Sequence, residues 1–520
     1  MLSFRLALNA GIDPTWDWDT DRWRCGDSWI QPVVHPALRH NIDDRPGVTT
    51  IVVRDAVTQP TPPETPNHYR GTGDVAGAER GDSLLLRIQP GRITLTAGIG
   101  GTAPLYLAVD GDILHGTWDL PALRHLTRRS TLLDRAMTRA LTRRHRYSSD
   151  TLFTDVTMLT ERATATFTAA GLNIAYPLPA KHVTRARALR PGVDTTAALA
   201  QLLTDALRPW QDCSAALGLE LSGGLDSGAV AVAARATIST PLRSFGLIVN
   251  GALGAEQHRR RLAIARQIGA VDDILRAHDH APFCENGIRT SGTAHDPRGE
   301  FYREAFEALA DRAAHSGVEI MLTGNGGDEI MAPRIDELPP PPPQPLTEIP
   351  WLGPRVREAV ASIDDNLAPS AVLPTPTLMS FAIHHPAYLR SGIWPVAPFT
   401  HPPLIRFAEQ LPLVLRRNKK LYRDFLTRAG LPALVTHPRR TEHFRDLMQH
   451  GLRHNGLQLA ERLLDDGMLL ADHGFIDPGA FHRTVQHARR SATVPSVLCD
   501  TLVLEVGLRS LQAPTTAPAV

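Results

Sequence analysis

Residues 219–234 read LELSGGLDSGAVAVAA, and this stretch decides the fold. An apolar run of strand length, 217–221, leads into a serine and two glycines, and residues 226–236 then have the apolar spacing of a helix. A glycine turn between a buried strand and a helix is typical of the carboxyl edge of an open parallel sheet, where ligands bind. The glycines let the backbone approach a ligand closely, and the helix N-terminus adds partial positive charge. The turn therefore predicts a phosphate site.

A carboxylate, Asp226, stands inside this predicted phosphate site. It would repel a phosphate directly, so its presence implies a divalent cation, and Mg²⁺ commonly bridges carboxylates to nucleotide phosphates. Ser222 and Ser227 offer hydroxyl donors to phosphate oxygens. The alternative is a tight turn in which an aspartate caps the helix. Six consecutive residues, SGGLDS, in a strand–turn–helix setting favour the phosphate site.

A second glycine turn lies about a hundred residues downstream. Residues 301–314 have their apolar side chains on one helix face, and 318–322 form a short apolar strand. The strand ends in TGNGGDE, residues 323–329. On its own this segment could equally be a glycine-rich turn with a solvated acidic end.

Together, SGGLDS and TGNGGDE resemble the two signature loops of the asparagine synthetase family, a group of N-type ATP pyrophosphatases, and the resemblance covers about 195–450. It implies that ATP is cleaved between its α and β phosphates, that a carboxylate is adenylated, and that an amine nitrogen displaces AMP. The cofactors implied are ATP and Mg²⁺, with Asp226 and Asp328 binding the metal. The nucleotide-binding residues implied are Leu221, Ser222, Gly223, Gly224, Leu225, Asp226, Ser227, Thr323 and Gly324.

The pattern of the chain changes near residue 190. Before it, strand pairs surround turns at Pro90-Gly91, Asp110-Gly111 and Ala170-Gly171, with a helical stretch over 121–142. After it, helices alternate with short strands, which is typical of a parallel α/β sheet. The expected helices are 195–208, 226–237 and 256–268, and the expected strands are 217–221 and 243–249.

We therefore predict an α/β plus α+β protein with two domains. Residues 1–190 loosely resemble the family's glutaminase domain and are predicted to be a degenerate Ntn-hydrolase-like domain. Residues 191–520 are predicted to be an ATP-pyrophosphatase (adenine nucleotide alpha hydrolase-like) domain, with a parallel sheet and extra helices. LPPPPPQPL, 338–346, predicts an exposed polyproline connector, and the residues from Gln512 predict a disordered tail.

Composition excludes several classes of protein. The 520 residues carry 55 basic and 54 acidic side chains, a net charge of +1, which argues against a nucleic-acid partner. We expect no membrane partner and a cytoplasmic location, because we find neither a signal peptide nor an apolar run of spanning length. The 4 cysteines are far apart, as expected for reduced thiols.

The source of the nitrogen separates members of the family. Its glutaminases use a cysteine at position 2; here that residue is Leu2, and the nearest cysteine is Cys25. We therefore expect no ammonia from glutamine. Two relatives that use an amine of their own substrate are β-lactam synthetase and the lasso-peptide cyclase, which joins an Asp or Glu side chain of a precursor peptide to its N-terminal amine.

Asn325 helps to choose between these relatives. At this position asparagine synthetases carry Glu and β-lactam synthetases carry Tyr, part of a base dyad. Asn325 cannot serve as a base, but an α-amine has a pKa of about 7.7–8.0, so part of it is already neutral near pH 7.5. The resemblance thus favours a macrolactam cyclase acting on a precursor peptide. The partners it implies are that peptide, a leader peptidase and a leader-binding protein. The alternative is a small-molecule amide ligase of the β-lactam synthetase or asparagine synthetase type.

The family also places a catalytic lysine after a Leu-Pro exit, and here the best match is Arg439, with Arg440 beside it. An arginine is a fixed charge suited to pyrophosphate or to the acyl-adenylate transition state. A plain surface role for both arginines is an equally good interpretation. Lys419 and Lys420 are the alternatives. His401 stands where the family usually has Asp.

Overall fold

The computed structural model describes residues 1–8, 16–55, 81–334, 336–338, 340, 342–343, 345–440 and 443–512. The predicted polyproline connector lies partly outside these residues. Of the tail predicted from Gln512, Gln512 itself is the last residue of a helix, and the rest lies outside the described residues. Among the helices in the described ranges, none is both long and apolar enough to cross a membrane.

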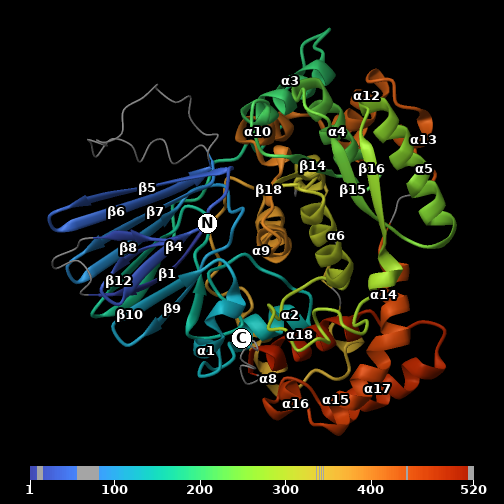
Figure 1. Ribbon diagram of the computed structural model, residues 1–520. Helices are drawn as coiled ribbons and strands as arrows, with labels where there is room; N and C mark the ends of the chain where they lie inside the picture. The colour runs from blue at the N-terminus through green and yellow to red at the C-terminus, as the bar shows by residue number, and fades with distance from the viewer. Residues whose placement is uncertain are drawn as a thin grey trace.

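Two antiparallel sheets are built from the first 175 residues (Figure 1). One has seven strands in the order β11-β9-β10-β1-β4-β3-β2, and the other has six in the order β13-β12-β8-β7-β6-β5. Alternate residues along β1, β6 and β7 are buried, so each sheet turns one apolar face to a shared core. The strands are β1 (Leu2–Ala7), β2 (Asp17–Asp19), β3 (Arg22–Cys25), β4 (Ser28–Pro32), β5 (Leu38–Arg45), β6 (Val48–Asp55), β7 (Ser83–Gln89), β8 (Arg92–Ala97), β9 (Tyr106–Asp110), β10 (Ile113–Thr117), β11 (Val156–Met158), β12 (Thr164–Thr168) and β13 (Gly171–Ala175).

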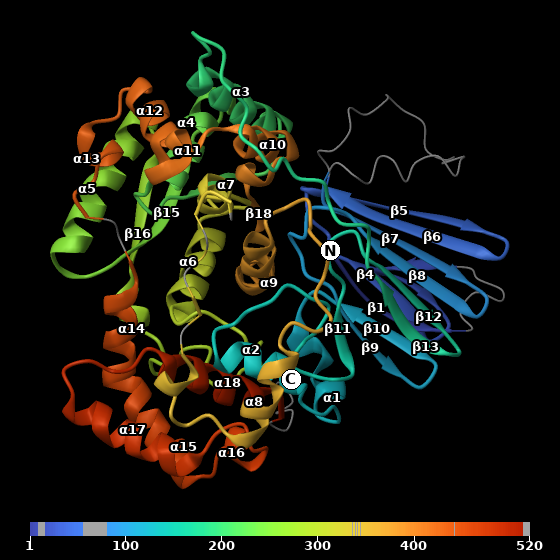
Figure 2. The same ribbon diagram turned by 180° about the vertical axis from the view of Figure 1, so that it is seen from behind.

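A parallel sheet of five strands follows, in the order β16-β15-β14-β17-β18. Helices cover both of its faces, as Figures 1 and 2 show, with α3, α4, α5 and α12 on one side and α6 and α9 on the other. The strands are β14 (Leu217–Glu220), β15 (Arg243–Ile248), β16 (Val271–Arg276), β17 (Ile320–Leu322) and β18 (Trp394–Val396). The helices are α3 (Thr195–Leu207), α4 (Leu225–Thr237), α5 (Gly251–Ile268), α6 (Arg303–His315), α7 (Gly327–Met331), α9 (Thr375–Arg390), α10 (Pro402–Gln410), α11 (Leu413–Arg416), α12 (Lys420–Arg428) and α13 (Ala433–Thr436).

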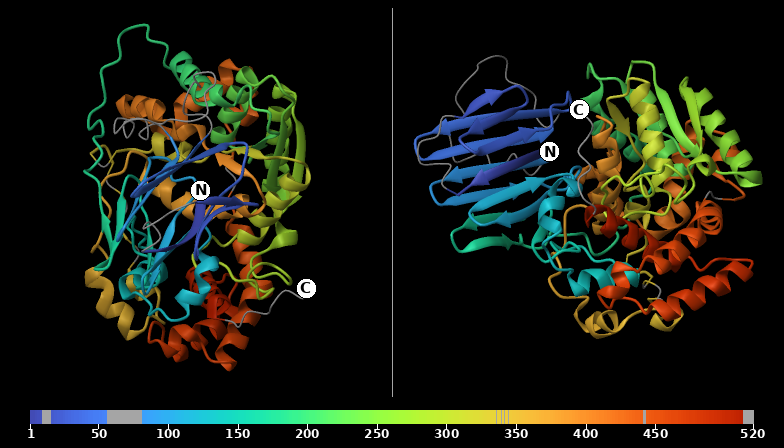
Figure 3. Two further views of the ribbon diagram at one scale, coloured as in Figure 1. Left: turned by 60° about the vertical axis from the view of Figure 1, so that its left-hand side comes forward. Right: turned by 60° about the horizontal axis from the view of Figure 1, so that its bottom comes forward.

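The remaining helices form a bundle with a hydrophobic core of its own, to which the helices that follow β10 also contribute. Figure 3 shows this bundle beside both the antiparallel and the parallel sheets. Its helices are α1 (Arg124–Thr127), α2 (Asp134–Leu141), α8 (Pro354–Ala359), α14 (Arg445–Gly451), α15 (Leu457–Asp465), α16 (Leu469–Asp472), α17 (Pro478–Arg490) and α18 (Val497–Gln512).

Two predicted helices differ from the structure. The stretch 121–142 is broken between α1 and α2, because the Leu133 N–H donates to Leu152 O (2.9 Å) and holds this segment against a neighbouring loop. Helix α5 begins at Gly251, five residues before the predicted start. The Gly251 φ of +76° allows a sharp turn directly after β15, so the helix needs no further loop. The predicted antiparallel strand pairs and the alternation of helices and parallel strands are confirmed.

Candidate functional site

The SGGLDS loop joins the carboxyl end of β14 to the N-terminus of α4. Helix α5 holds this loop by its carbonyl groups: Gln257 Nε2 donates to Ser222 O (3.0 Å) and Arg260 Nε donates to Gly223 O (3.1 Å). Gly223 has a φ of +88°, and a Cβ there would lie 3.1 Å from Gln257 O. Gly224 caps α4 without a side-chain hydrogen bond. The helix N-terminus is thus available to an anion.

The second loop, residues 323–326, joins β17 to α7 directly beside the first. A Cβ at Gly324 would lie 2.9 Å from the backbone nitrogen of Ser227, and one at Gly327 would lie 2.8 Å from Asp226 Oδ1. Only glycine lets the two loops approach this closely. The structure therefore brings together two segments that the sequence separates by about a hundred residues.

Asp226 and Asp328 meet at one ammonium group. Lys419 Nζ lies 2.5 Å from Asp226 Oδ2 and 2.6 Å from Asp328 Oδ1. The other oxygen of Asp226, Oδ1, is buried and has no hydrogen-bond partner among the described residues. Two carboxylates with an unsatisfied oxygen, beside a helix N-terminus, form a donor set that fits Mg²⁺ together with a polyphosphate.

Burial dominates the electrostatics of this site. It raises the pKa of Asp226 to about 6; the Lys419 charge opposes this shift and the Asp328 charge adds to it. Burial lowers the pKa of Lys419, but Asp226 and Asp328 outweigh it, and the net shift is upward. Burial also raises the pKa of Glu329. The site thus carries more carboxylate than its single ammonium neutralises, which favours a cation.

Lys419 is positioned by an unusual backbone. Asn418 (φ 52°, ψ 28°) and Lys419 (φ 52°, ψ 40°) are both left-handed, between α11 and α12. Such a conformation costs a non-glycine residue about 1–2 kcal/mol, and strain of this kind clusters at functional sites. From the same segment, Tyr422 donates from its hydroxyl to Gly327 O (3.2 Å). Sequence reasoning offered Lys419 only as an alternative to Arg439.

The structure places the other predicted residues as follows. Leu221 and Leu225 are buried in the core, so they contribute backbone groups to the loop. Thr323 is buried, and its hydroxyl has no hydrogen-bond partner in the described part of the chain; Asn325 is partly exposed in the turn. Arg439 is exposed and has no ion pair among the described residues. Its neighbour Arg440 accepts a hydrogen bond at its carbonyl from Arg260 (3.2 Å). Lys420 pairs with Asp424.

Two cavities lie between the parallel-sheet part of the chain and the antiparallel sheets, and neither is lined by residues 222–227, residues 323–328 or Lys419. A cavity of about 270 Å³ is lined by Glu329, next to Asp328. A larger one of about 1240 Å³ lies between the antiparallel sheets and β18, and the two share four lining residues: His182, Leu373, Ile405 and Glu409. They are therefore adjoining parts of one groove, and we call them the groove.

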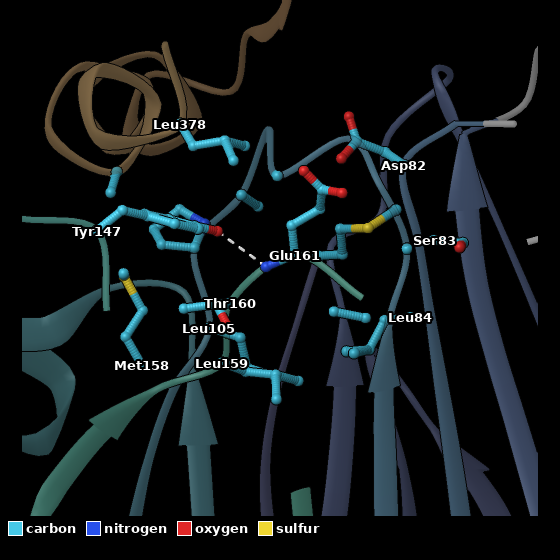
Figure 4. Close-up of a pocket in the computed structure, with 17 residues that line it drawn as sticks. Asp82, Ser83, Leu84, Leu105, Tyr147, Met158, Leu159, Thr160, Glu161 and Leu378 are labelled. Carbon is cyan, nitrogen blue, oxygen red and sulfur yellow. Dashed lines mark hydrogen bonds between the residues drawn. The ribbon is translucent and has the colours of Figure 1, made fainter. Parts of the chain in front are cut away.

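A third cavity, of about 50 Å³, lies where the antiparallel sheets meet α9 (Figure 4). The carboxylates of Asp82 and Glu161 lie near each other at its wall, and the Glu161 N–H donates to the Tyr147 hydroxyl (2.8 Å). Its 17 lining residues include no cysteine. Cys25 lies elsewhere, on β3, and burial raises the pKa of its thiol. This cavity thus contains no thiol nucleophile.

Comparison with known proteins gives one family. Residues 198–335 match the family model described as asparagine synthase, and this segment contains both glycine loops. The match supports an asparagine synthetase family member and ATP-dependent amide-bond formation in general. ATP is the nucleotide this family uses, typically with Mg²⁺. Among curated proteins no match is found.

The chain also aligns with solved structures. The U34-tRNA thiolase NcsA from Methanococcus maripaludis, with its [4Fe-4S] cluster, aligns over 56% of this chain and 80% of its own, with 11% identity and a TM-score of 0.26. The glutamine phosphoribosylpyrophosphate amidotransferase from B. subtilis, complexed with ADP and GMP, aligns over 50% and 69%, with 12% identity and a TM-score of 0.19. Superpositions with TM-scores this low carry no structural argument.

Proposed function

We propose that the protein is an ATP- and Mg²⁺-dependent, AMP-forming carbon–nitrogen ligase that closes a macrolactam in a precursor peptide, as lasso-peptide cyclases do. An Asp or Glu side chain of the peptide would be adenylated, and the peptide's N-terminal amine would displace AMP. The observation that carries the proposal is the convergence of Asp226, Asp328 and Lys419 between two glycine loops at the end of a parallel sheet.

Each group has a stated role in this proposal. Ser222, Gly223, Gly224 and Ser227 would hold the pyrophosphate, and Asp226 and Asp328 would bind Mg²⁺. The metal, when bound, would supply positive charge to the phosphate oxygens. Lys419, already between the two carboxylates, would then turn its charge to the phosphates. Arg439 would approach from the neighbouring loop as a second fixed cation.

Two observations support an amine of the substrate as the nitrogen source, and a third supports a peptide as the substrate. The cavity beside α9 has no cysteine to release ammonia from glutamine. Asn325 is a neutral side chain, which suffices for an amine that is partly unprotonated near neutral pH. The larger part of the groove, about 1240 Å³, exceeds the roughly 300–1,000 Å³ of small-molecule sites and suits a peptide.

This proposal assigns roles to both parts of the chain. Residues 1–190 would be a degenerate glutaminase-like domain that forms one wall of the groove, and residues 191–520 would be the ATP-pyrophosphatase domain. A leader peptidase and a leader-binding protein would prepare the peptide in the cytoplasm.

Mass spectrometry tests the proposal. The purified protein, ATP and Mg²⁺ are incubated with the short peptide encoded beside its gene, after removal of the leader. We expect a loss of one water from the peptide, with AMP formed in equal amount, and neither change with Asp226→Ala. AMP formation with free amino acids but with no peptide would contradict the macrolactam and favour a small-molecule ligase.

A further inference from the structure

The connection between β13 and α3 is an ordered, extended segment on the outside of the molecule, as the left view of Figure 3 shows. We call residues 178–190 the basic strap. Its backbone is fixed at three points: Ala180 N–H donates to Ser370 O (2.7 Å), Val183 N–H to Glu409 Oε2 (3.1 Å) and Arg187 N–H to Gln410 O (2.9 Å). The strap therefore lies along α10, at the edge of the groove.

The strap carries three exposed arginines, whereas its His182 pairs with Glu409. Arg185, Arg187 and Arg190 are exposed, and none has an ion pair or hydrogen bond from its side chain within the described part of the chain. The strap contains no acidic residue. Arg185 and Arg187 are two residues apart, and the backbone bends at Arg185.

The charges inside the groove add to this surface. Lys181 and Arg406, which line it, likewise have no ion pair among the residues described. Several carboxylates that line it already have partners. They are Asp82, which accepts from Thr102; Asp205, which pairs with Arg208 (2.7 Å); and Glu409, which pairs with His182. Lys181 and Arg406 thus add positive charge to the three arginines of the strap. Glu329 and Asp82, whose hydrogen-bond partner Thr102 is neutral, add carboxylates to the groove.

Apolar side chains are interspersed among these cations. Leu178 is 85% exposed and Leu189 is 40% exposed, and Leu178 also lines the groove. An exposed leucine beside unpaired arginines is typical of surfaces that bind linear peptides carrying acidic and apolar residues. A flat anionic surface would meet the arginines, but it could not enter the groove.

We propose that the basic strap and the groove bind an extended acidic segment of the peptide substrate. Carboxylates of the peptide would pair with Arg185, Arg187 and Arg190, and the chain would continue past Leu178 into the groove toward Glu329. This inference rests on the proposed function for the identity of the occupant. The charge pattern itself does not depend on ATP chemistry, so the two can be tested separately.

Fluorescence anisotropy with labelled octaglutamate, without ATP, tests the strap. Reversal of all three charges in Arg185→Glu/Arg187→Glu/Arg190→Glu is expected to weaken binding about tenfold. The matched control is Arg235→Glu/Arg259→Glu/Arg266→Glu, which reverses three exposed arginines on α4 and α5 and should change binding less than about twofold. Equal losses in both variants would show non-specific attraction and overturn the proposal.

Photo-crosslinking tests the groove independently of charge. A benzoylphenylalanine replacing Leu178 should crosslink to octaglutamate, and one replacing Val271, 64% exposed on β16, should not. Crosslinking at neither position would overturn the proposal, as would binding to vesicles of anionic lipid but not to octaglutamate. If octaglutamate binds as expected while Asp226→Ala leaves macrolactam formation unchanged, the proposed ATP site fails and the strap stands.

Discussion

The ammonium group of Lys419 lies 2.5 Å from the partly buried carboxylate of Asp226, although 193 residues separate the two in sequence. Lys419 also pairs with Asp328, so it occupies the space between the two carboxylates that a metal would share. Lysine and Mg²⁺ thus compete for the same negative charge. Several measurable consequences depend on this geometry.

Removal of Lys419 is expected to lower the thermal stability of the metal-free protein. In Lys419→Met the Asp226 carboxylate, 18% exposed, loses the one cation that pairs with it among the described residues, which costs about 1–3 kcal/mol for a partly buried pair. Differential scanning calorimetry should show a lower Tm for the variant. Added MgCl₂ should raise the Tm of the variant by more than it raises the Tm of the natural protein. The control is Lys420→Met, whose pair with Asp424 is largely exposed and worth little.

Asp226→Asn and Asp328→Asn are each expected to weaken binding of a fluorescent ATP analogue in Mg²⁺. Mutation of residues that only surround a metal ligand weakens binding by roughly 10–100-fold, so removal of a ligand itself should weaken affinity for the analogue by at least this much. Titrations with and without EDTA measure it. Asp424→Asn, on the exposed side of α12, is the control. Retention of full Mg²⁺-dependent affinity in Asp226→Asn would contradict the assignment of the metal site.

Mg²⁺-dependent nucleotide binding is expected to fall in acid. The pKa of Asp226 is raised from 3.8 to about 6, so protons compete with the metal below this value. Affinity should decrease by up to tenfold per pH unit below pH 6 and be constant above it. The same shift means that the folded state binds the proton more tightly than the unfolded state does. Asp226 therefore makes the metal-free protein less stable as pH rises from about 4 to 6. A flat binding profile between pH 5 and 7 would contradict the shift.

Gly327→Ala tests the close approach of the two loops. Its Cβ would lie 2.8 Å from Asp226 Oδ1, so the carboxylate must move away from the metal site. Overpacking of this kind costs about 1–3 kcal/mol, and affinity for the ATP analogue should fall with it. Gly299→Ala is the matched control, because the nearest atom to its Cβ is 3.4 Å away. Equal affinities of the two variants would show that the contact is not needed.

The two loops and the parallel sheet could be predicted because their signals are local. Residues 222–227 and 323–326 each follow a short apolar strand, and glycine at these positions has a steric reason that the structure shows. The early start of α5 at Gly251 depends on a single positive φ, which a helical pattern does not indicate.

Contacts between distant segments could not be predicted in the same way. The sequence favours Arg439 as the cation and leaves Lys419 as an alternative, because spacing within 413–440 does not indicate which side chain meets Asp226. The left-handed backbone at Asn418 and Lys419 brings the Lys419 ammonium to both carboxylates. The basic strap has no helical or strand periodicity, and its order comes from hydrogen bonds to α10 and to the loop before α9.

One consequence follows from the edge of the parallel sheet. On the β17 side of β18, the Trp394 N–H donates to Glu319 O (2.8 Å), and the Val396 carbonyl accepts from the Thr323 N–H (2.8 Å). The residue between them, Pro395, therefore presents its backbone to the groove. Proline has no N–H, and an edge strand without this donor is a poor template for another strand. A peptide in the groove therefore cannot continue the sheet through a regular ladder. If a peptide binds in the groove as proposed, its recognition has to come from side chains and not from an extended backbone alone. The missing donor also disfavours edge-to-edge pairing of two copies of the chain at β18.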